Sequence, residues 1–250
     1  MERDSAIGEA FRKGFRAAWQ NLPAILALQG AMAAIVAIYY CWPLGASYLG
    51  RYAEWQQSGG ILVAALATAC AGGILSEISL VYFQQAGHWT RTNLENVAFK
   101  WILFFISGAI TYEFYRLQGY WFGQGTTLNV LVPKVLVDQF GYTILWAAPF
   151  YTLTTRWQAL GYSFEKLKRE LWMEIFIERF LPILITNWMF WIPGVSLIYS
   201  MPALLQTPLF IFAVAIWGLL LPAVTKQERL PSAEKQPSVG GPAIVGQPAE

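Results

Sequence analysis

The segment from Phe180 to Thr225 contains no charged side chain, although Arg179 and Lys226 lie directly on either side of it. The segment is more than forty residues long, and a helix that crosses the hydrocarbon core of a bilayer needs roughly 20 apolar residues. Pro202 lies near its middle, where the turn between two such helices would fall. A soluble fold does not require such a stretch, so we expect the chain to be built inside a membrane.

The composition of the chain agrees with a membrane location. Of its residues, 56% are hydrophobic and only 13% are charged, whereas soluble domains carry roughly 25% charged residues. Twelve Trp and twelve Tyr side chains are suited to the aromatic belts at membrane interfaces. A net charge of +2 is too small to indicate a nucleic-acid partner. The expected partner is the lipid bilayer, and the expected architecture is one transmembrane domain.

The pattern along the chain predicts an all-α, multi-pass transmembrane helical bundle with an amphipathic helix in front. We divide it into an N-terminal interfacial helix (1–21), a transmembrane domain (22–225) and a tail (226–250). The tail is rich in Pro, Gly and Ser, which is typical of disorder. The interfacial helix is indicated by apolar residues that recur every four positions. These are Ile7, Phe11, Phe15 and Trp19.

Six apolar segments are long enough to predict membrane helices. Basic residues are concentrated before the first segment, in the second and fourth loops and after the last segment, and the odd-numbered loops are poorer in them. Six crossings place all the basic regions on one side, as the positive-inside rule favours, whereas five would separate the two termini. We therefore expect six spans with both ends on the cytoplasmic or equivalent side. The segments are Leu22–Tyr40, Gly60–Phe83, Val97–Tyr115, about Leu131–Thr155, about Ile175–Tyr199 and Pro202–Leu221.

Several kinds of chemistry are disfavoured by what the sequence contains. His88 is the only histidine, and Cys41 and Cys70 form no CxxC pair, so a zinc site of the usual ligand spacing is not expected. Neither of the glycine-rich phosphate-binding motifs is present. The sequence predicts no metal, no cofactor and no catalytic residue, and we expect a protein that is not an enzyme.

Small residues on the second span form a stripe at helical spacing. Ala65, Ala69 and Gly73 are followed at the same interval by Glu77, and Gly108 offers a small side chain on the third span. Small residues four apart let membrane helices approach closely. Two interpretations remain open. The stripe serves packing alone, or it also directs Glu77 into the bundle, where a charge costs roughly 2.5–3.5 kcal/mol on insertion scales.

Four polar residues within the spans are candidates for a polar pathway: Glu77, Glu113, Asp138 and Asn187. Lys134 is one turn from Asp138, so these two can pair along a helix face. Asn187 is far from either interface and must hydrogen-bond inside the bundle. If the acids converge, they line a path for small polar solutes. If they reach the interfaces separately, they are structural.

Three motifs in the second half of the chain carry a resemblance to a known family. KVLVDQ at 134–139, LITNWMFWIP at 184–193 and MP at 201–202 resemble the Mpv-seventeen/peroxisomal membrane protein family (22 kDa type), over roughly residues 58–225. Departures from the family pattern include Ala109 in place of proline and Gln206 in place of arginine, and they point to a distant, bacterial homologue. The residues that carry the resemblance are Lys134, Asp138, Gln139, Asn187, Trp191, Pro193, Pro202 and Trp217.

The resemblance implies a small multi-pass protein that forms a pore for small solutes, since family members are thought to do so and are not known as enzymes. The hypothesis is therefore a channel-like protein for small polar solutes. The alternative is a non-transporting membrane scaffold or assembly factor. A homo-oligomer is left open as a partner. The acidic N-terminal residues and the charge bias favour a bacterial plasma membrane over inner mitochondrial or peroxisomal membranes.

Overall fold

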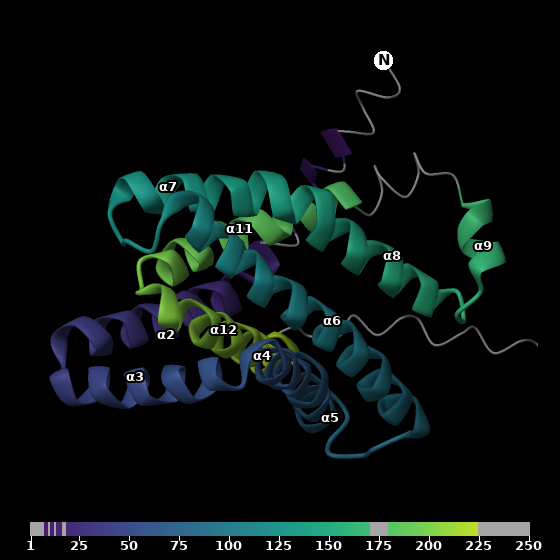
Figure 1. Ribbon diagram of the computed structural model, residues 1–250. Coiled ribbons are helices and arrows are strands. Elements are labelled where there is room, and N and C mark those ends of the chain that lie inside the picture. Colours follow the sequence, from purple (N-terminus) through teal and green to yellow (C-terminus); the bar gives the residue numbers. More distant parts are fainter. Residues whose placement is uncertain (1–7, 10, 13, 17–18, 171–179, 225–250) are drawn as a thin grey trace, which may run out of the picture.

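The computed structural model describes residues 8–9, 11–12, 14–16, 19–170 and 180–224, and throughout these ranges the chain is built from helices joined by short turns (Figure 1). The predicted all-α fold is confirmed. Two stretches, η1 and η2, are wound as π-helix. The elements are α2 (Leu22–Cys41), α3 (Pro43–Ser58), α4 (Gly60–Ala69), η1 (Cys70–Leu75), α5 (Ser76–Gln84), α6 (Arg91–Phe122), α7 (Leu128–Leu136), η2 (Val137–Ala147), α8 (Ala148–Ala159), α9 (Phe164–Arg169), α11 (Leu181–Tyr199) and α12 (Ala203–Val224).

Three helices are long and apolar enough to cross a membrane: α2, the continuous helix Gly60–Gln84 and α6. A shorter apolar helix covers Ala203–Leu219 within α12. The other two predicted spans are also helical where they are described, in α7 to α8 and in α11. The start of the fifth predicted span, like the tail 226–250, lies outside the described residues.

The segment between the first two predicted spans is a helix rather than a loop. Trp42 is extended and Pro43 opens α3, a position where the missing N–H of proline costs nothing. Helix α3 returns beside α2 as a hairpin (Figure 1). The polar residues of this segment gave no apolar pattern from which a helix could be predicted. Gly45, Ala53 and Gln56 are nevertheless buried in α3.

The π-helix η2 ends at Ala147, and Pro149 follows near the start of α8. Proline cannot donate to the carbonyl four residues before it, and a shift to bonds that span five residues accommodates the break. Because η2 carries Asp138 and Gln139, this winding determines where their side chains point.

The stripe of small residues lies at the contact between α4–η1 and α6. A Cβ atom added at Gly108 would lie 2.6 Å from the Thr68 side chain, and one at Gly73 would lie 2.9 Å from the backbone of Trp101. Both glycines therefore allow an approach that a larger residue would prevent. The alanines of the stripe, both buried, are Ala65 and Ala69.

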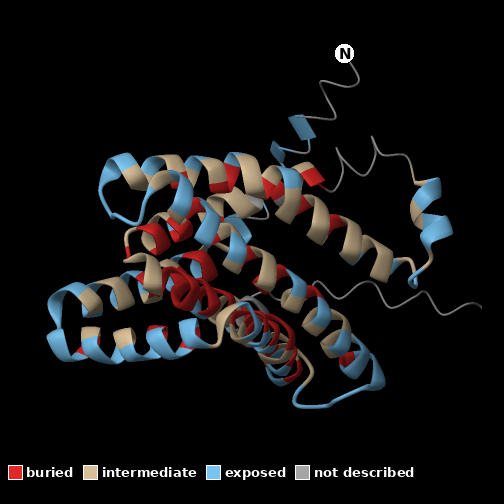
Figure 2. Ribbon diagram, viewed as in Figure 1, coloured by how far each residue is buried: buried red, intermediate tan, exposed pale blue. Residues whose placement is uncertain are grey.

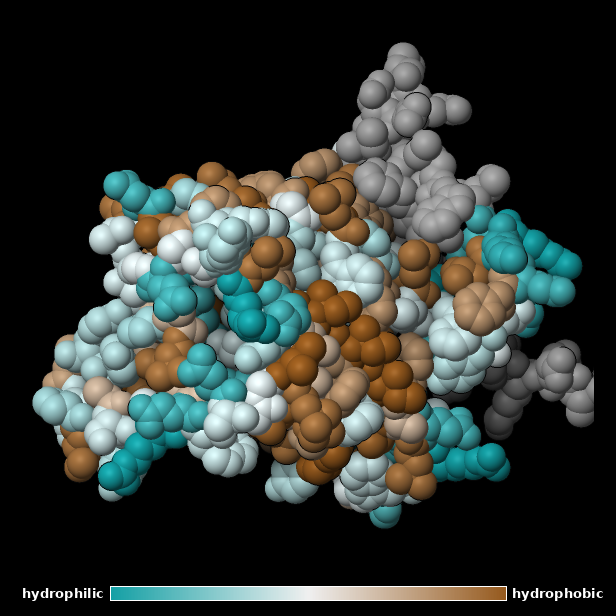
Figure 3. Space-filling view, viewed as in Figure 1, coloured by the Kyte–Doolittle hydropathy of each residue, from teal (hydrophilic) through white to brown (hydrophobic). Residues whose placement is uncertain are grey.

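Buried residues concentrate along α4 and α12 at the centre of the bundle, whereas α3 and α9 turn exposed faces outward (Figure 2). Apolar side chains also form a broad patch on the surface, with hydrophilic atoms on both sides of it (Figure 3). Exposed apolar residues across the molecule include Ile102 and Leu145, which are 57% and 80% exposed. A surface of this kind fits contact with lipid rather than with water.

The N-terminal segment is helical at the residues that are described before α2. Phe11, Phe15 and Trp19 are all exposed, so these three aromatic side chains are not packed into the bundle. The predicted interfacial helix requires this arrangement. Ile7, the first member of the predicted stripe, lies outside the described residues.

Candidate functional site

Asp138 forms the centre of a buried group of polar side chains. Its Oδ1 accepts a hydrogen bond from Nε2 of Gln139 at 2.8 Å, and its Oδ2 accepts one from the hydroxyl of Tyr199 at 2.5 Å. All three side chains are at most 5% exposed. Tyr199 is the last residue of α11, so the contact ties the end of that helix to η2.

Gln118 connects this group to α6 and α7. Its Nε2 donates to the hydroxyl of Tyr199 at 2.9 Å and to the backbone carbonyl of Lys134 at 3.2 Å. Lys134 is 0% exposed, and its Nζ lies 5.7 Å from the centre of the Tyr199 ring. We call the set Gln118, Lys134, Asp138, Gln139 and Tyr199 the Asp138 cluster.

Lys134 and Asp138 do not form the ion pair that their spacing would allow. Nζ of Lys134 has no hydrogen-bond partner among the described residues, and Asp138 is bound by Tyr199 and Gln139 instead. The reason is the change of winding between the two residues. Lys134 lies on the α-helix α7 and Asp138 on the π-helix η2, so the regular four-residue alignment is lost.

The Asp138 cluster therefore contains polar atoms that the described residues leave unpaired. Besides Nζ of Lys134, these are Oε1 of Gln118 and Oε1 of Gln139. Burial of an unpaired ammonium group is costly, because a charge out of water needs a partner or coordinating groups. One strong donor and two acceptors thus lie in the same buried group as a carboxylate.

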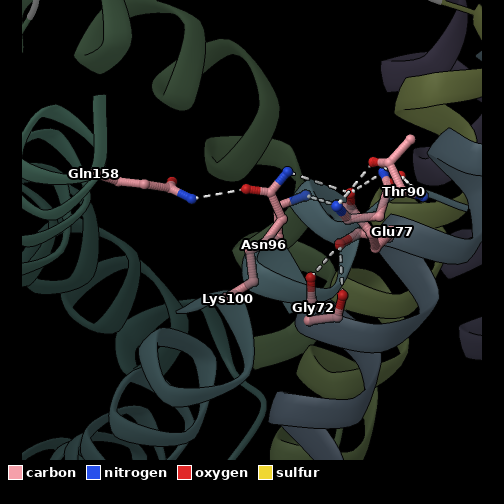
Figure 4. Close-up of polar contacts among 9 residues, drawn as sticks. Gly72, Glu77, Thr90, Asn96, Lys100 and Gln158 are labelled. Atoms are coloured by element: carbon pink, nitrogen blue, oxygen red, sulfur yellow. Dashed lines mark hydrogen bonds and ion pairs between the residues drawn. The ribbon is translucent and has the colours of Figure 1, made fainter. Parts of the chain in front are cut away.

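Glu77 forms a second and different group near the turn between α5 and α6. The carboxylate is 0% exposed and accepts from Lys100 at 2.6 Å and from Asn93 at 2.8 Å. Asn96 contributes a longer bond of 3.4 Å, and Gln158 of α8 donates to Asn96 at 2.9 Å. Figure 4 shows Asn96 between Gln158 and Glu77.

The position of this second group is set by the start of α6. Thr90 caps the helix, and its side chain and that of Asn93 each accept from the other's backbone N–H, which is the reciprocal arrangement of a capping box. The cap fixes the first turn of α6, from which Asn93 reaches Glu77. We call Glu77, Asn93, Asn96 and Lys100 the Glu77 cluster, and its carboxylate is fully paired.

The four candidates for a polar pathway do not meet. Glu113 is exposed and pairs with Arg116 at 3.0 Å, and Asn187 is half-buried on α11 and makes no hydrogen bond to the described members of either cluster. Helix α6 supplies Lys100 to one cluster and Gln118 to the other. The rise of a helix separates these two residues by about 27 Å along its axis. That distance is close to the ~30 Å thickness of a hydrocarbon core.

The two tryptophans of the motif pack against phenylalanine rings. Trp191 contacts Phe210 with ring centres 5.8 Å apart, and Trp217 contacts Phe190 at 4.2 Å. Pro193 lies inside α11, while Pro202 precedes α12. Of the motif, only the 134–139 part enters a polar cluster. Within the described residues no group of three or more His, Cys, Asp or Glu side chains is arranged to hold a metal ion.

Sequence reasoning did not find Gln118 or Asn93, nor the roles of Tyr199 and Lys100. A signal for the Glu77 cluster was present, since Asn93, Asn96 and Lys100 follow one another at spacings of three and four at the start of the third span. No local pattern connects Gln118 or Tyr199 with Asp138, because the contacts span several helices.

Comparisons with protein-family models, with curated proteins and with solved structures give no match to this chain.

Proposed function

We propose that this chain is a multi-pass membrane protein that passes small polar solutes, and that the Asp138 cluster is the selective part of the route. The observation that carries the proposal is Lys134, whose ammonium group is fully buried without a hydrogen-bond partner among the described residues. Ionisable residues inside a membrane are costly and mark solute or ion pathways by default. A passing solute would supply the hydrogen-bond partner that the described residues do not.

The chemistry of the Asp138 cluster favours solutes that both donate and accept hydrogen bonds. Lys134 offers donors, and the free oxygens of Gln118 and Gln139 offer acceptors. A small anion would be attracted by Lys134 and repelled by Asp138, so the two charges together favour uncharged, hydroxyl-rich or zwitterionic solutes.

The arrangement of the turns supports six crossings. In Figure 1 the turns that follow α2, α6 and α11 lie on the left, and those that follow α5 and α8 lie on the right. Basic residues of the described chain are abundant on the right-hand segments, for example Arg91 and Lys166. Six crossings put the start of α2 and the end of α12 on the same side as these segments, which the positive-inside rule identifies as cytoplasmic. A bacterial plasma membrane remains the proposed location.

A solute-flux measurement tests the proposal. Wild-type protein in liposomes is compared with Lys134→Met, which keeps much of the side-chain volume and removes the charge, and with Asp138→Asn. We expect both substitutions to change the relative uptake of glycerol, glycine and acetate. Glu113→Gln is the matched control, because that exposed residue lies on α6 outside the Asp138 cluster. Wild-type liposomes that take up no more solute than protein-free ones would refute the proposal.

A non-transporting scaffold is the second candidate, and the Glu77 cluster favours it. Its carboxylate is satisfied by Lys100 and two asparagines, which is the arrangement expected of a brace between helices. If wild-type liposomes show no flux while Lys134→Met is folded and more stable than wild type, the scaffold is the better description. Kinship with the Mpv-seventeen family is likewise a proposal, supported by the meeting of Lys134, Asp138 and Gln139 in one cluster.

A further inference from the structure

A cavity of about 570 Å³ lies between α2, α3, α12 and the α4–η1 junction. Its volume is in the range of sites that hold small organic ligands. The walls are almost entirely apolar and include Ile35, Leu49, Leu205 and Leu209. No member of the Asp138 cluster or the Glu77 cluster lines it, so the cavity is separate from the site proposed for solutes.

The π-helix η1 helps to form this cavity. Cys70, Ala71 and Leu75, all in η1, line it directly. The wider turn of a π-helix displaces side chains from the regular packing positions, and such segments are frequent at functional sites. Two of the other lining residues are also small, namely Ala67 of α4 and Ala215 of α12. Larger side chains at these positions would fill the space.

The cavity is too apolar to hold ordered water, and leaving it empty would destabilise the fold. Water needs polar partners, and the destabilisation caused by an unfilled cavity grows with its volume. The cavity opens at the surface, since Tyr52 and Phe212 on its wall are 42% and 41% exposed. It is bordered by α2 and by Gly60–Gln84, two of the helices able to cross a membrane. In a bilayer crossed by these two helices, hydrocarbon would reach this opening.

We propose that this cavity binds one acyl chain of a membrane lipid or fatty acid, which enters beside Tyr52 and Phe212. The apolar walls, the opening on a membrane-facing surface and the small residues of η1 and α12 all fit a flexible hydrocarbon chain. The inference does not depend on solute transport, because it uses a different part of the molecule.

Binding of cis-parinaric acid, a fluorescent fatty acid, to the purified full-length protein provides the first test. Ala215→Phe and Ala67→Phe place a ring in the cavity and should weaken binding by about 10-fold or more, or roughly 1.4 kcal/mol. The matched control is Ala34→Phe, at an exposed position of α2 outside the cavity, which should bind as wild type does. Equal affinity in all four proteins would overturn the proposal.

The second test leaves the packing of the cavity unchanged. Cys70 lines the cavity and Cys41 does not, and both thiols are free and exposed. In a Cys41→Ser background, oleate should slow the reaction of Cys70 with a lipid-soluble maleimide. In a Cys70→Ser background, it should leave the reaction of Cys41 unchanged. Equal rates at Cys70 with and without oleate, or a dimer that Ala215→Phe dissociates, would assign the cavity to another occupant and overturn the proposal.

Discussion

The hydroxyl of Tyr199 donates a 2.5 Å hydrogen bond to Oδ2 of Asp138, and the two residues are 61 positions apart in the chain. This bond connects the last residue of α11 to the π-helix η2, and Gln118 of α6 donates to the same hydroxyl. One tyrosine thus joins three segments through a single oxygen atom, and its removal should affect all three together.

Tyr199→Phe should lower the free energy of unfolding by about 1.5–3 kcal/mol, the range for a hydrogen bond to a charged group. The loss leaves Asp138 with fewer donors and leaves Nε2 of Gln118 without one of its two acceptors. Thermal unfolding in detergent measures the change. Tyr82→Phe, at a side chain that is 71% exposed, is the control and should be near neutral. Equal melting temperatures for the two variants would contradict the role given to Tyr199.

Breaking the ion pair between Glu77 and Lys100 should destabilise the junction of α5 and α6. Glu77 is fully buried and Lys100 is 30% exposed, so we expect Glu77→Gln to cost about 1–3 kcal/mol. A double-mutant cycle with Lys100→Met isolates the pairwise energy.

The exposed pair Arg91 and Glu95, with side chains 92% and 58% exposed, is the comparison for that cycle. Surface pairs typically contribute about 0–1 kcal/mol, so its coupling energy should be smaller. A coupling energy between Glu77 and Lys100 no larger than that of the surface pair would show that the Glu77 cluster is not a brace.

Gly73→Ala should reduce the yield of folded protein, because the added Cβ would lie 2.9 Å from the backbone of Trp101. Gly30→Ala is the matched control, since a Cβ at Gly30 meets nothing within 4 Å and alanine favours a helix more than glycine does. Size-exclusion chromatography of the detergent-solubilised proteins compares the two. A Gly73→Ala protein that behaves like Gly30→Ala would contradict the close approach of η1 and α6.

Reporter fusions after Gln20 and after Gln227 should give the same signal, because six crossings bring the two ends of the chain to one side. Alkaline phosphatase and green fluorescent protein fusions in bacterial cells measure this directly. Opposite signals at the two positions would mean an odd number of crossings.

Much of the fold follows from properties that the sequence carries locally. A charge-free segment from 180 to 225 and the apolar runs before it require a non-aqueous environment. Long apolar surfaces are unfavourable in water, whereas charged side chains are unfavourable in hydrocarbon. The stripe of Ala65, Ala69 and Gly73 likewise indicates a close helix contact by its spacing alone. Helix α3 was missed because its buried residues are the small Gly45 and Ala53 and the polar Gln56, which give no apolar periodicity for hydropathy to detect.

The partners of the polar residues were decided by the tertiary structure. Spacing allowed Lys134 to pair with Asp138, but the change from α-helix to π-helix separates them, and the Tyr199 hydroxyl donates to the carboxylate instead. In the same way Glu77 takes its charge partner from α6, 23 positions away. The sequence by itself determines that these groups lie among apolar helices. Which donor binds which acceptor depends on how distant helices pack. A hydrogen bond requires a donor–acceptor distance that is right to within a few tenths of an ångström, and no local sequence pattern encodes that distance.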